Sequence, residues 1–312
     1  MKKDYYPFFF KLIILLLCCV PLLSYAQTEQ DALMMGERNF CVAGTITYNS
    51  WTDYWEGTFK RDNKNMGRVS TKSAVLMLNY GLKKNLNILA SLPYVKTQAN
   101  QGTLAGLDGF QDVSLFVKWR PLQWQVNNST LSLLAVGGYS TPSHGYNIDF
   151  LPMSIGLGSQ VLTGRLLADL QVSKFTATIS GAFLRRGNVE LDRSAYYTDR
   201  LINSAEVKIP DAANFQLRTG YRTRHVIAEA FLDNMTTLGG FDIRKNDMPF
   251  VSNRMNSTRV GIEGKHYLTK LPALGFHAAA WHTLAGRNVG QATGFLAGVD
   301  YIFDLTPDTA KD

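Results

Sequence analysis

The sequence predicts an all-β fold: a transmembrane, antiparallel, up-and-down β-barrel of about 12 strands, within a range of about 10 to 14. Three observations carry this prediction. Apolar and polar residues alternate with a period of two, the connections between the alternating segments are short and long by turns, and the chain opens with a secretory signal. Together they are typical of barrels in the bacterial outer membrane.

The clearest alternation lies between Asp112 and Arg120. In an extended strand successive side chains point to opposite faces, so this segment has one apolar face and one polar face. The apolar face consists of Val113, Leu115, Val117 and Trp119, and the other consists of Asp112, Ser114, Phe116, Lys118 and Arg120. We expect the apolar face to contact lipid, and Lys118 and Arg120 to face a wet lumen.

Alternation and turn residues together predict strands near 40–49, 68–81, 85–97, 110–121, 129–140, 158–171, 175–187, 212–222, 225–235, 255–268, 274–285 and 291–304. The connections alternate in length. Residues 122–128 and 269–273 are short connections, whereas 50–67, 98–109, 188–211 and 236–254 are long. An even number of strands then places both termini and the short turns on the periplasmic rim.

Aromatic residues near strand ends predict an interfacial girdle, with ordinary β-propensity as the alternative explanation. The residues concerned are Tyr48, Tyr80, Tyr94, Trp119, Tyr139, Tyr221, Tyr267, Tyr301 and Phe303.

The first 26 residues predict a cleaved signal peptide. Lys2 and Lys3 precede an apolar run over 12–23, and Ser24-Tyr25-Ala26 offers small residues at the cleavage site. A membrane anchor would need roughly 20 apolar residues, and Lys11 and Pro21 interrupt this run; a lipoprotein signal is disfavoured because Leu17 precedes Cys18. The mature chain would begin near Gln27, and its predicted location is the outer membrane.

Four regions follow from these signals: a signal peptide over 1–26, a short periplasmic or plug segment over 27–39, the barrel over 40–304 and a tail over 305–312.

Charged residues make up 18% of the chain, below the roughly 25% of soluble domains, and aromatic residues make up 12%. A soluble β-sandwich is the structural rival, because alternation alone does not exclude it. The net charge of +7 is too small for a nucleic-acid-binding signature, and a mature chain whose cysteine is Cys41 can form no internal disulfide.

Charged residues on the predicted lumen face would decide what passes through the bore. The cations Lys118, Arg120, Arg218, Arg222, Arg259 and Lys265 outnumber the acids Glu229, Asp233 and Glu263. A modest preference for anions is one interpretation. The other is that these charges pair across strands and fill a narrow bore.

Two long loops, 188–213 and 239–259, hold more apolar residues than a solvated loop needs. In the second loop we expect Phe241, Ile243, Met248 and Phe250 to form an apolar constriction in the bore, with Arg244, Asp247 and Arg254 as polar contacts for a ligand. Packing on the rim as a structural cap is the alternative.

No catalytic or metal site is predicted. His144, His225, His266, His277 and His282 lack metal-ligand spacing. Ser143-His144 and His282-Thr283 contain the residue types of a lipase active site. Neither pair shows a recognisable pattern of nucleophile, base and orienting group. We expect neither an enzyme nor a cofactor.

The stretch GFQDVSLFVKWRP (Gly109–Pro121) and the strand LNILASLPY (Leu86–Tyr94) resemble the outer-membrane barrel family linked to the MetA pathway of phenol degradation, which is similar to the long-chain fatty-acid transporter group. The signal end SYAQ and the loop FDIRKNDMPF resemble the Bacteroidetes members. This resemblance implies passage of small hydrophobic compounds across the outer membrane. Relatives with firm transport function carry an N-terminal plug, and the segment around Leu33, Met34 and Met35 is the candidate here for entering the bore.

The predicted function is therefore an outer-membrane channel or transporter for small, hydrophobic compounds, with outer-membrane lipid and a small hydrophobic ligand as partners and no nucleic acid. Two alternatives stay open: a non-transporting structural or surface barrel, and a membrane-embedded lipid hydrolase. The sequence leaves the oligomeric state undetermined.

Overall fold

Twelve long antiparallel strands close into a barrel in the computed structural model, which describes residues 28–245 and 247–307. The predicted signal peptide, 1–26, and most of the predicted tail lie outside the described residues. The barrel strands are β1 (Asn39–Trp51), β4 (Val69–Lys83), β5 (Leu86–Ala99), β7 (Asp112–Val126), β8 (Ser129–Pro142), β9 (Val161–Val172), β10 (Phe175–Arg186), β15 (Ala212–Arg222), β16 (Val226–Thr237), β17 (Asn256–Tyr267), β18 (Leu274–Arg287) and β19 (Thr293–Asp304).

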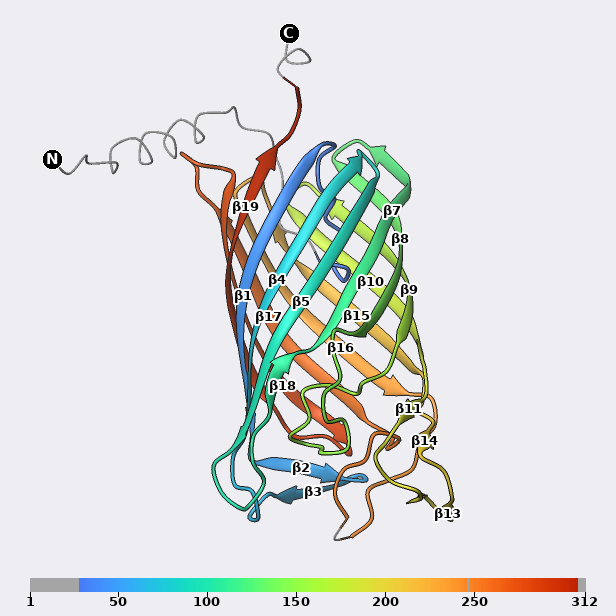
Figure 1. The fold of residues 1–312 in the computed structure, drawn as a ribbon. Coiled ribbons are helices and arrows are strands. Elements are labelled where there is room, and N and C mark those ends of the chain that lie inside the picture. Colours follow the sequence, from blue (N-terminus) through green and yellow to red (C-terminus); the bar gives the residue numbers. More distant parts are fainter. Residues whose placement is uncertain (1–27, 246, 308–312) are drawn as a thin grey trace, which may run out of the picture.

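Each barrel strand pairs with the next barrel strand along the chain, and the ring closes between the first and the last of them. At this seam Asn39 lies opposite Asp304, and the register runs on to Ser50 opposite Thr293. Figure 1 shows the tilted strands around one lumen, with β1 and β19 side by side. The predicted barrel and its strand number are confirmed. Among the described residues, no helix is long and apolar enough to span a membrane.

The two rims differ in the length of their connections. One rim carries short turns such as 127–128 and 173–174, where Asn127 and Ser173 adopt positive φ angles of 52° and 56°, as tight hairpin turns require. The other rim carries the long loops (Figure 1, lower end), except that 288–292 is short there. Short strands in these loops are β2 (Asp53–Glu56), β3 (Phe59–Asp62), β6 (Asp108–Phe110), β11 (Val189–Glu190), β12 (Tyr196–Tyr197), β13 (Leu201–Ile202) and β14 (Glu206–Val207).

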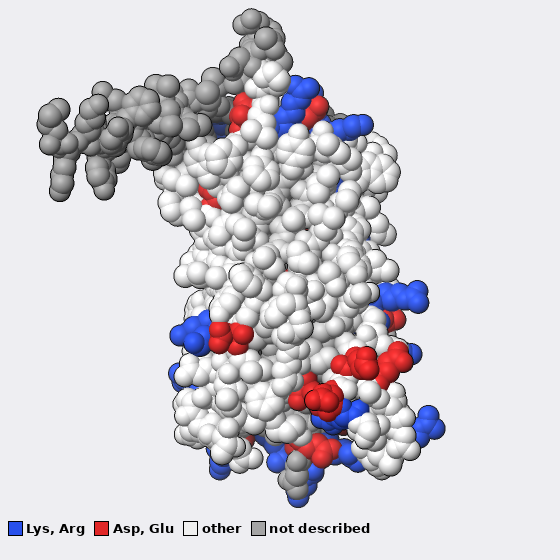
Figure 2. Space-filling model, in the orientation of Figure 1, with Lys and Arg blue, Asp and Glu red and all other residues white. Residues whose placement is uncertain are grey.

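The two faces of the wall follow the predicted parity. Leu115 and Trp119 on β7 are 53% and 48% exposed on the outside, whereas Lys118 between them is fully buried inside. Figure 2 shows a broad belt with few charged side chains in the upper half of the visible face, and most charged side chains at the upper end and in the lower half. A barrel in a membrane needs such an apolar outer belt.

Three details differ from the sequence-based prediction. The predicted strand 110–121 is two elements, β6 and β7, which Gln111 separates. The predicted turn at 122–128 is mostly strand, because β7 continues to Val126 past a register shift between Trp119 and Leu122. Pro121 lies at this shift, where a residue without a backbone N–H is tolerated. Tyr267 is 1% exposed and packs inside the barrel, so its assignment to the girdle was wrong.

Candidate functional site

The N-terminal segment 28–37 runs inside the barrel, and Lys118 on β7 holds it there. The Lys118 Nζ donates to the backbone oxygens of Thr28, Asp31 (2.9 Å) and Leu33 (3.2 Å), and to the Asp31 carboxylate at 3.1 Å. A second cation, Lys265 on β17, lies 3.5 Å from the other Asp31 oxygen. A buried ammonium without partners is costly, so these contacts make the segment part of the folded lumen.

Apolar contacts hold the same segment on its other sides. Ala32 packs against Leu134, Val136 and Leu167 from β8 and β9, with Met34 beside them. Met35 is fully buried in a second cluster with Cys41, Ala43, Tyr267 and Ile302. The N-terminal segment thus covers apolar residues of the wall that face the lumen. Leu33, Met34 and Met35, the residues expected to enter the bore, lie within this segment.

A glycine lets the segment leave the lumen close to the wall. Arg38 N donates to the Gly81 carbonyl oxygen at 2.7 Å. A Cβ atom built at Gly81 would lie 1.9 Å from the Gly36 carbonyl oxygen, which is far inside van der Waals contact. Position 81 therefore has to be glycine for this backbone path.

A chain of ion pairs joins residues from four strands of the lumen wall and passes over a fifth, β10. Lys265 lies 3.3 Å from Glu263, which lies 2.9 Å from Arg218. Arg218 in turn lies 3.4 Å from Glu229. The chain continues from Glu229 to Arg222 (2.9 Å) and on to Asp169 (3.2 Å), so it runs from β17 through β16 and β15 to β9. Alternating charges at these distances neutralise one another inside a narrow bore.

Asp233 belongs to a second cluster, nearer the long-loop rim. Its carboxylate lies 2.7 Å from Arg259 and accepts a hydrogen bond from Asn214 at 2.9 Å. Asn214 also accepts from Arg165 on β9 at 2.9 Å. The interpretation that lumen charges pair across strands is thus confirmed for Arg218, Arg222, Glu229 and Asp233.

Arg120 stands apart from this network. It donates to the Lys84 carbonyl oxygen at 3.2 Å, and within residues 28–245 and 247–307 no carboxylate lies within 4.0 Å of it. It lines a cavity of about 650 Å³ at the short-turn rim, together with Lys84, Lys174, Arg222 and Arg224. Ala32 to Gly36 form the inner wall of this cavity.

Two further cavities lie on the opposite side of the N-terminal segment. One of about 330 Å³ is lined by Arg165, Asp233 and Arg259, and one of about 220 Å³ by Arg218, Glu263 and Lys265. Glu29 and Gln30 line both of them. The segment therefore lies between the cavity at the short-turn rim and these two lumen cavities. We call residues 28–37 the plug segment.

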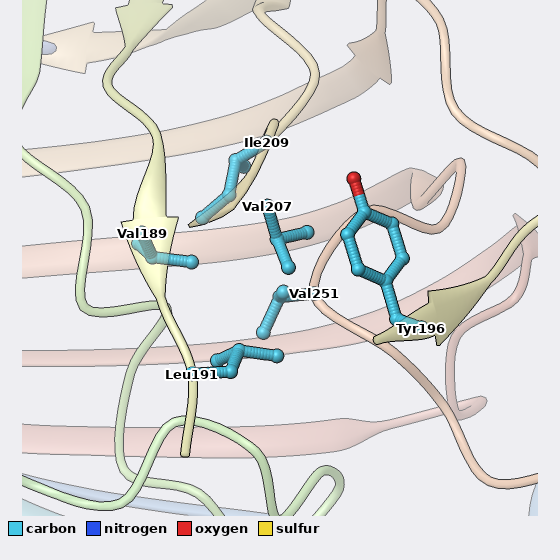
Figure 3. Packing of buried hydrophobic residues seen from close by; sticks show 6 residues of the cluster. All are labelled: Val189, Leu191, Tyr196, Val207, Ile209 and Val251. Carbon is cyan, nitrogen blue, oxygen red and sulfur yellow. The ribbon is translucent and has the colours of Figure 1, made fainter. Parts of the chain in front are cut away.

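The long loops pack on one another outside the lumen and form a layer of their own. Its centre consists of six buried residues, Val189, Leu191, Tyr196, Val207, Ile209 and Val251, shown in Figure 3. Five of them come from the loop 187–211 and one from the loop 238–255. We call this set the loop core. Burial of its side chains supplies the loops with the hydrophobic stabilisation that a solvated connector lacks.

Beside the loop core lies a cavity of about 360 Å³, and all the residues that line it belong to loops. Six residues predicted for this site line the cavity: Phe241, Ile243, Arg244, Asp247, Met248 and Phe250. Further apolar residues in the lining include Leu104, Phe150 and Leu151. The structure places these residues in the loop layer, which is the position of a rim cap. They do not form a constriction between the strands. Arg254 does not line this cavity and instead donates to the Gly239 carbonyl oxygen at 3.3 Å.

Cations in the loop layer lie over aromatic rings. The Arg244 guanidinium is 4.0 Å from the centre of the Tyr197 ring and 2.9 Å from the Asp247 carboxylate. The Arg193 guanidinium is 5.5 Å from the centre of the Phe250 ring. The loop cavity therefore joins an aromatic lining with a few charged groups, as small-molecule sites do.

Asp242 ties this loop to the barrel. Its carboxylate accepts from Arg287 at 2.6 Å and 2.7 Å and from the Asn288 side chain at 2.8 Å. The hydrogen bonds from Arg287, with those from Asn288, lower the pKa of Asp242 to about 2 although partial burial opposes the shift. The carboxylate is thus charged at neutral pH and fixes the loop at the end of β18.

The pair Ser143-His144 does meet: Ser143 Oγ and His144 Nδ1 are 3.2 Å apart, in an exposed position. The His144 ring lies edge-on to Tyr146, and none of the contacts that the structure gives His144 is to a carboxylate. Among the described residues, no three His, Cys, Asp or Glu side chains are placed to hold a metal ion.

Several site residues were missed at the level of sequence. Asp31 precedes the first strand and shows no periodicity. Arg165 and Asp169 do alternate with outward Leu166 and Leu170, so the period-two signal could have revealed them. Phe150 lies in the loop 143–160, and no pattern in the sequence pointed to it.

The fold is similar to that of known outer-membrane barrels. An outer membrane channel from Pseudomonas putida F1 superposes with a TM-score of 0.70 at 13% identity, covering 89% of this chain and all of that one. The translocator domain of the autotransporter NalP from Neisseria meningitidis (TM-score 0.44, 12% identity, 86% and 89% covered) and a mutant of the monoaromatic hydrocarbon channel TodX (0.42, 12%, 90% and 92%) are more distant. No protein-family model and no curated protein sequence matches the chain. The outer-membrane type of barrel is thus supported as a fold, and membership of the phenol-degradation family is not shown.

Proposed function

We propose that the protein is an outer-membrane channel for small hydrophobic compounds, as in the family that its sequence resembles. The observation that carries the proposal is the series of cavities along one axis: an aromatic cavity in the loop layer, two lumen cavities beyond it and a larger cavity at the short-turn rim. The similar Pseudomonas protein is described as an outer membrane channel, which supports this assignment and an outer-membrane location.

Each region has a separate task in this proposal. The loop cavity takes up an apolar compound from the medium because Phe241, Phe250 and Met248 offer it a partly dry surface. The plug segment separates the lumen cavities from the short-turn cavity, so passage requires it to shift. No reaction is involved, since a channel lets a solute move down its concentration gradient.

A second candidate is a non-transporting surface barrel. The ion-paired lumen favours it, because Arg218, Arg222 and Glu229 fill the bore as structural charges would. The two candidates differ in whether solute crosses a membrane that contains the barrel.

Uptake of a radiolabelled small aromatic hydrocarbon tests the proposal in an outer-membrane expression host that lacks its own channel for such compounds. We expect the protein to raise the initial rate above that of the empty host. The double variant Phe241→Ala, Phe250→Ala should lose most of that gain. Phe59→Ala is the matched control, because Phe59 is 67% exposed on β3 and does not line the loop cavity. Uptake equal to that of the empty host would favour the surface barrel.

A further inference from the structure

A row of outward side chains crosses the barrel wall near the long-loop rim. Tyr48 on β1 lies opposite Phe295 on β19 on one side and opposite Lys72 on β4 on the other. Lys72 lies directly opposite Lys96 on β5. All four lie on the same strand parity as the exposed residues Ile46, Ala74, Tyr94 and Ala297, so they point outward from the wall.

Lys72 and Lys96 face each other on this surface. Two neighbouring positive charges without a counter-ion repel each other. Both are exposed, and among residues 28–245 and 247–307 neither has a carboxylate within 4.0 Å. Like charges directly opposite on adjacent strands are destabilising, and more so beside an apolar medium. The arrangement therefore calls for an anion between Lys72 and Lys96.

Asp108 on β6 is the nearest candidate within the chain, since it lies opposite Lys96. Its carboxylate instead accepts a hydrogen bond from the Tyr94 hydroxyl. Asp108 could at most compensate Lys96, since Lys72 lies one strand farther away. One positive charge would remain without compensation.

An apolar hollow lies next to the lysines, on the side toward the middle of the wall. In the next row Ile46 lies opposite Ala297 on one side and Ala74 on the other, and Ala74 lies opposite Tyr94. The two alanines are small beside Ile46 and Tyr94, and the wall is hollowed over them to about 540 Å³. Lys72 and Lys96 line the same hollow.

We propose that this hollow binds a phosphate-bearing lipid of the outer leaflet. A phosphate lies between Lys72 and Lys96 and offsets their repulsion, and an acyl chain lies along Ala74, Ile46 and Ala297. Tyr48 and Tyr94 flank the site at the depth where aromatic residues meet headgroups. The inference rests on the proposed outer-membrane location, and it names a lipid because a free anion would leave the apolar hollow unfilled.

Native mass spectrometry of the detergent-purified barrel tests this site with lipid A, a bisphosphorylated and acylated disaccharide, as the probe. We expect the protein to retain lipid A, and Lys72→Gln combined with Lys96→Gln to weaken retention about tenfold or more. Lys64→Gln combined with Lys208→Gln is the charge-matched control, because both lysines are exposed loop residues that do not line the hollow. Heat-modifiable migration on gels verifies that each variant is folded.

A second variant separates the two parts of the site. Ala74→Leu fills the hollow and keeps both lysines, so it should weaken binding of lipid A but not of its deacylated, phosphorylated sugar. Equal retention by all variants would overturn the proposal. So would undiminished retention of dephosphorylated lipid A, complete competition by inorganic phosphate, or a dimer that occupies this face. Uptake of the hydrocarbon is measured separately, so a barrel that retains lipid A without transporting contradicts only the proposed function.

Discussion

Lys118 and Asp31 form a buried ion pair inside the barrel, with 3.1 Å between the Lys118 Nζ and an Asp31 carboxylate oxygen. The pair joins a barrel strand to a segment that precedes the barrel in the chain. Neither residue has water as an alternative partner at this depth, since their side chains are 0% and 4% exposed. This ion pair is therefore one of the contacts that position the plug segment, beside the Asp31–Lys265 pair and the apolar contacts of Ala32 and Met35.

Asp31→Asn should loosen the plug segment. Removing one member of a buried ion pair leaves the other charge uncompensated, which typically costs about 3–5 kcal/mol. We expect larger and more frequent open events in single-channel recordings from planar bilayers. Glu29→Gln is the control within the same segment and should behave like the unmodified protein. An unchanged conductance for Asp31→Asn would show that the segment stays in place without this pair.

The two faces of β7 should respond differently to a new charge. Leu115→Arg places a guanidinium on the lipid face and should cost roughly 2–4 kcal/mol of folding free energy if the position is near the bilayer middle. Ser114→Arg points into the lumen and should be tolerated far better. Urea unfolding in lipid vesicles measures both values. Equal losses at the two positions would contradict the assigned faces.

The loop core should stabilise the loop layer and not the barrel. Val207 and Val251 are 0% and 2% exposed. Val207→Ala removes two buried carbons and should cost on the order of 2 kcal/mol locally. Limited proteolysis should then cut the loop 187–211 faster while the strands stay protected. Leu201→Ala in the same loop, where the leucine is 62% exposed, should leave the cleavage rate unchanged.

Acid should release the loop that Asp242 anchors. A carboxylate whose pKa is lowered in the folded state stabilises that state fully above its ordinary pKa of 3.8, and this stabilisation is lost as the pH falls toward about 2. Pepsin cleavage in the loop 238–255 should therefore rise, per unit of pepsin activity, between pH 4 and pH 2. In Asp242→Asn the loop should be cleaved readily at pH 4 already and show a smaller rise. Identical profiles for the two proteins would rule out this anchor.

The barrel itself was predictable because the alternation that marks each wall strand lies within a short stretch of sequence. A period of two marks each wall strand and both of its faces, so Leu115 outside and Lys118 inside follow from parity alone. The partners of the lumen charges do not follow in this way. Arg222 reaches Asp169 across β10, and such contacts depend on strand stagger and side-chain length, which no single strand reveals.

The candidate site was less predictable than the fold. Asp31 lies in a segment without periodicity, and its contacts with Lys118 and Lys265 join positions far apart in the chain. The many apolar residues in the loop 239–259 indicated that these side chains are buried. They did not indicate against which part of the protein the side chains pack. Phe241 and Phe250 were expected in the bore and lie against other loops, because those loops, and not the strands, present the matching apolar residues Leu151 and Tyr196.

The seam at which Asn39 lies opposite Asp304 also fixes an order of assembly. The two strands that form it are the first and the last of the barrel, so the ring cannot close until nearly the whole chain has been delivered to the membrane. Before that moment β1 and β19 each present an open hydrogen-bonding edge, which lipid cannot satisfy. The plug segment is joined directly to β1 and contacts β7, β8, β9 and β17. It can therefore settle while the curved sheet is still open and serve as the surface around which the last strands close.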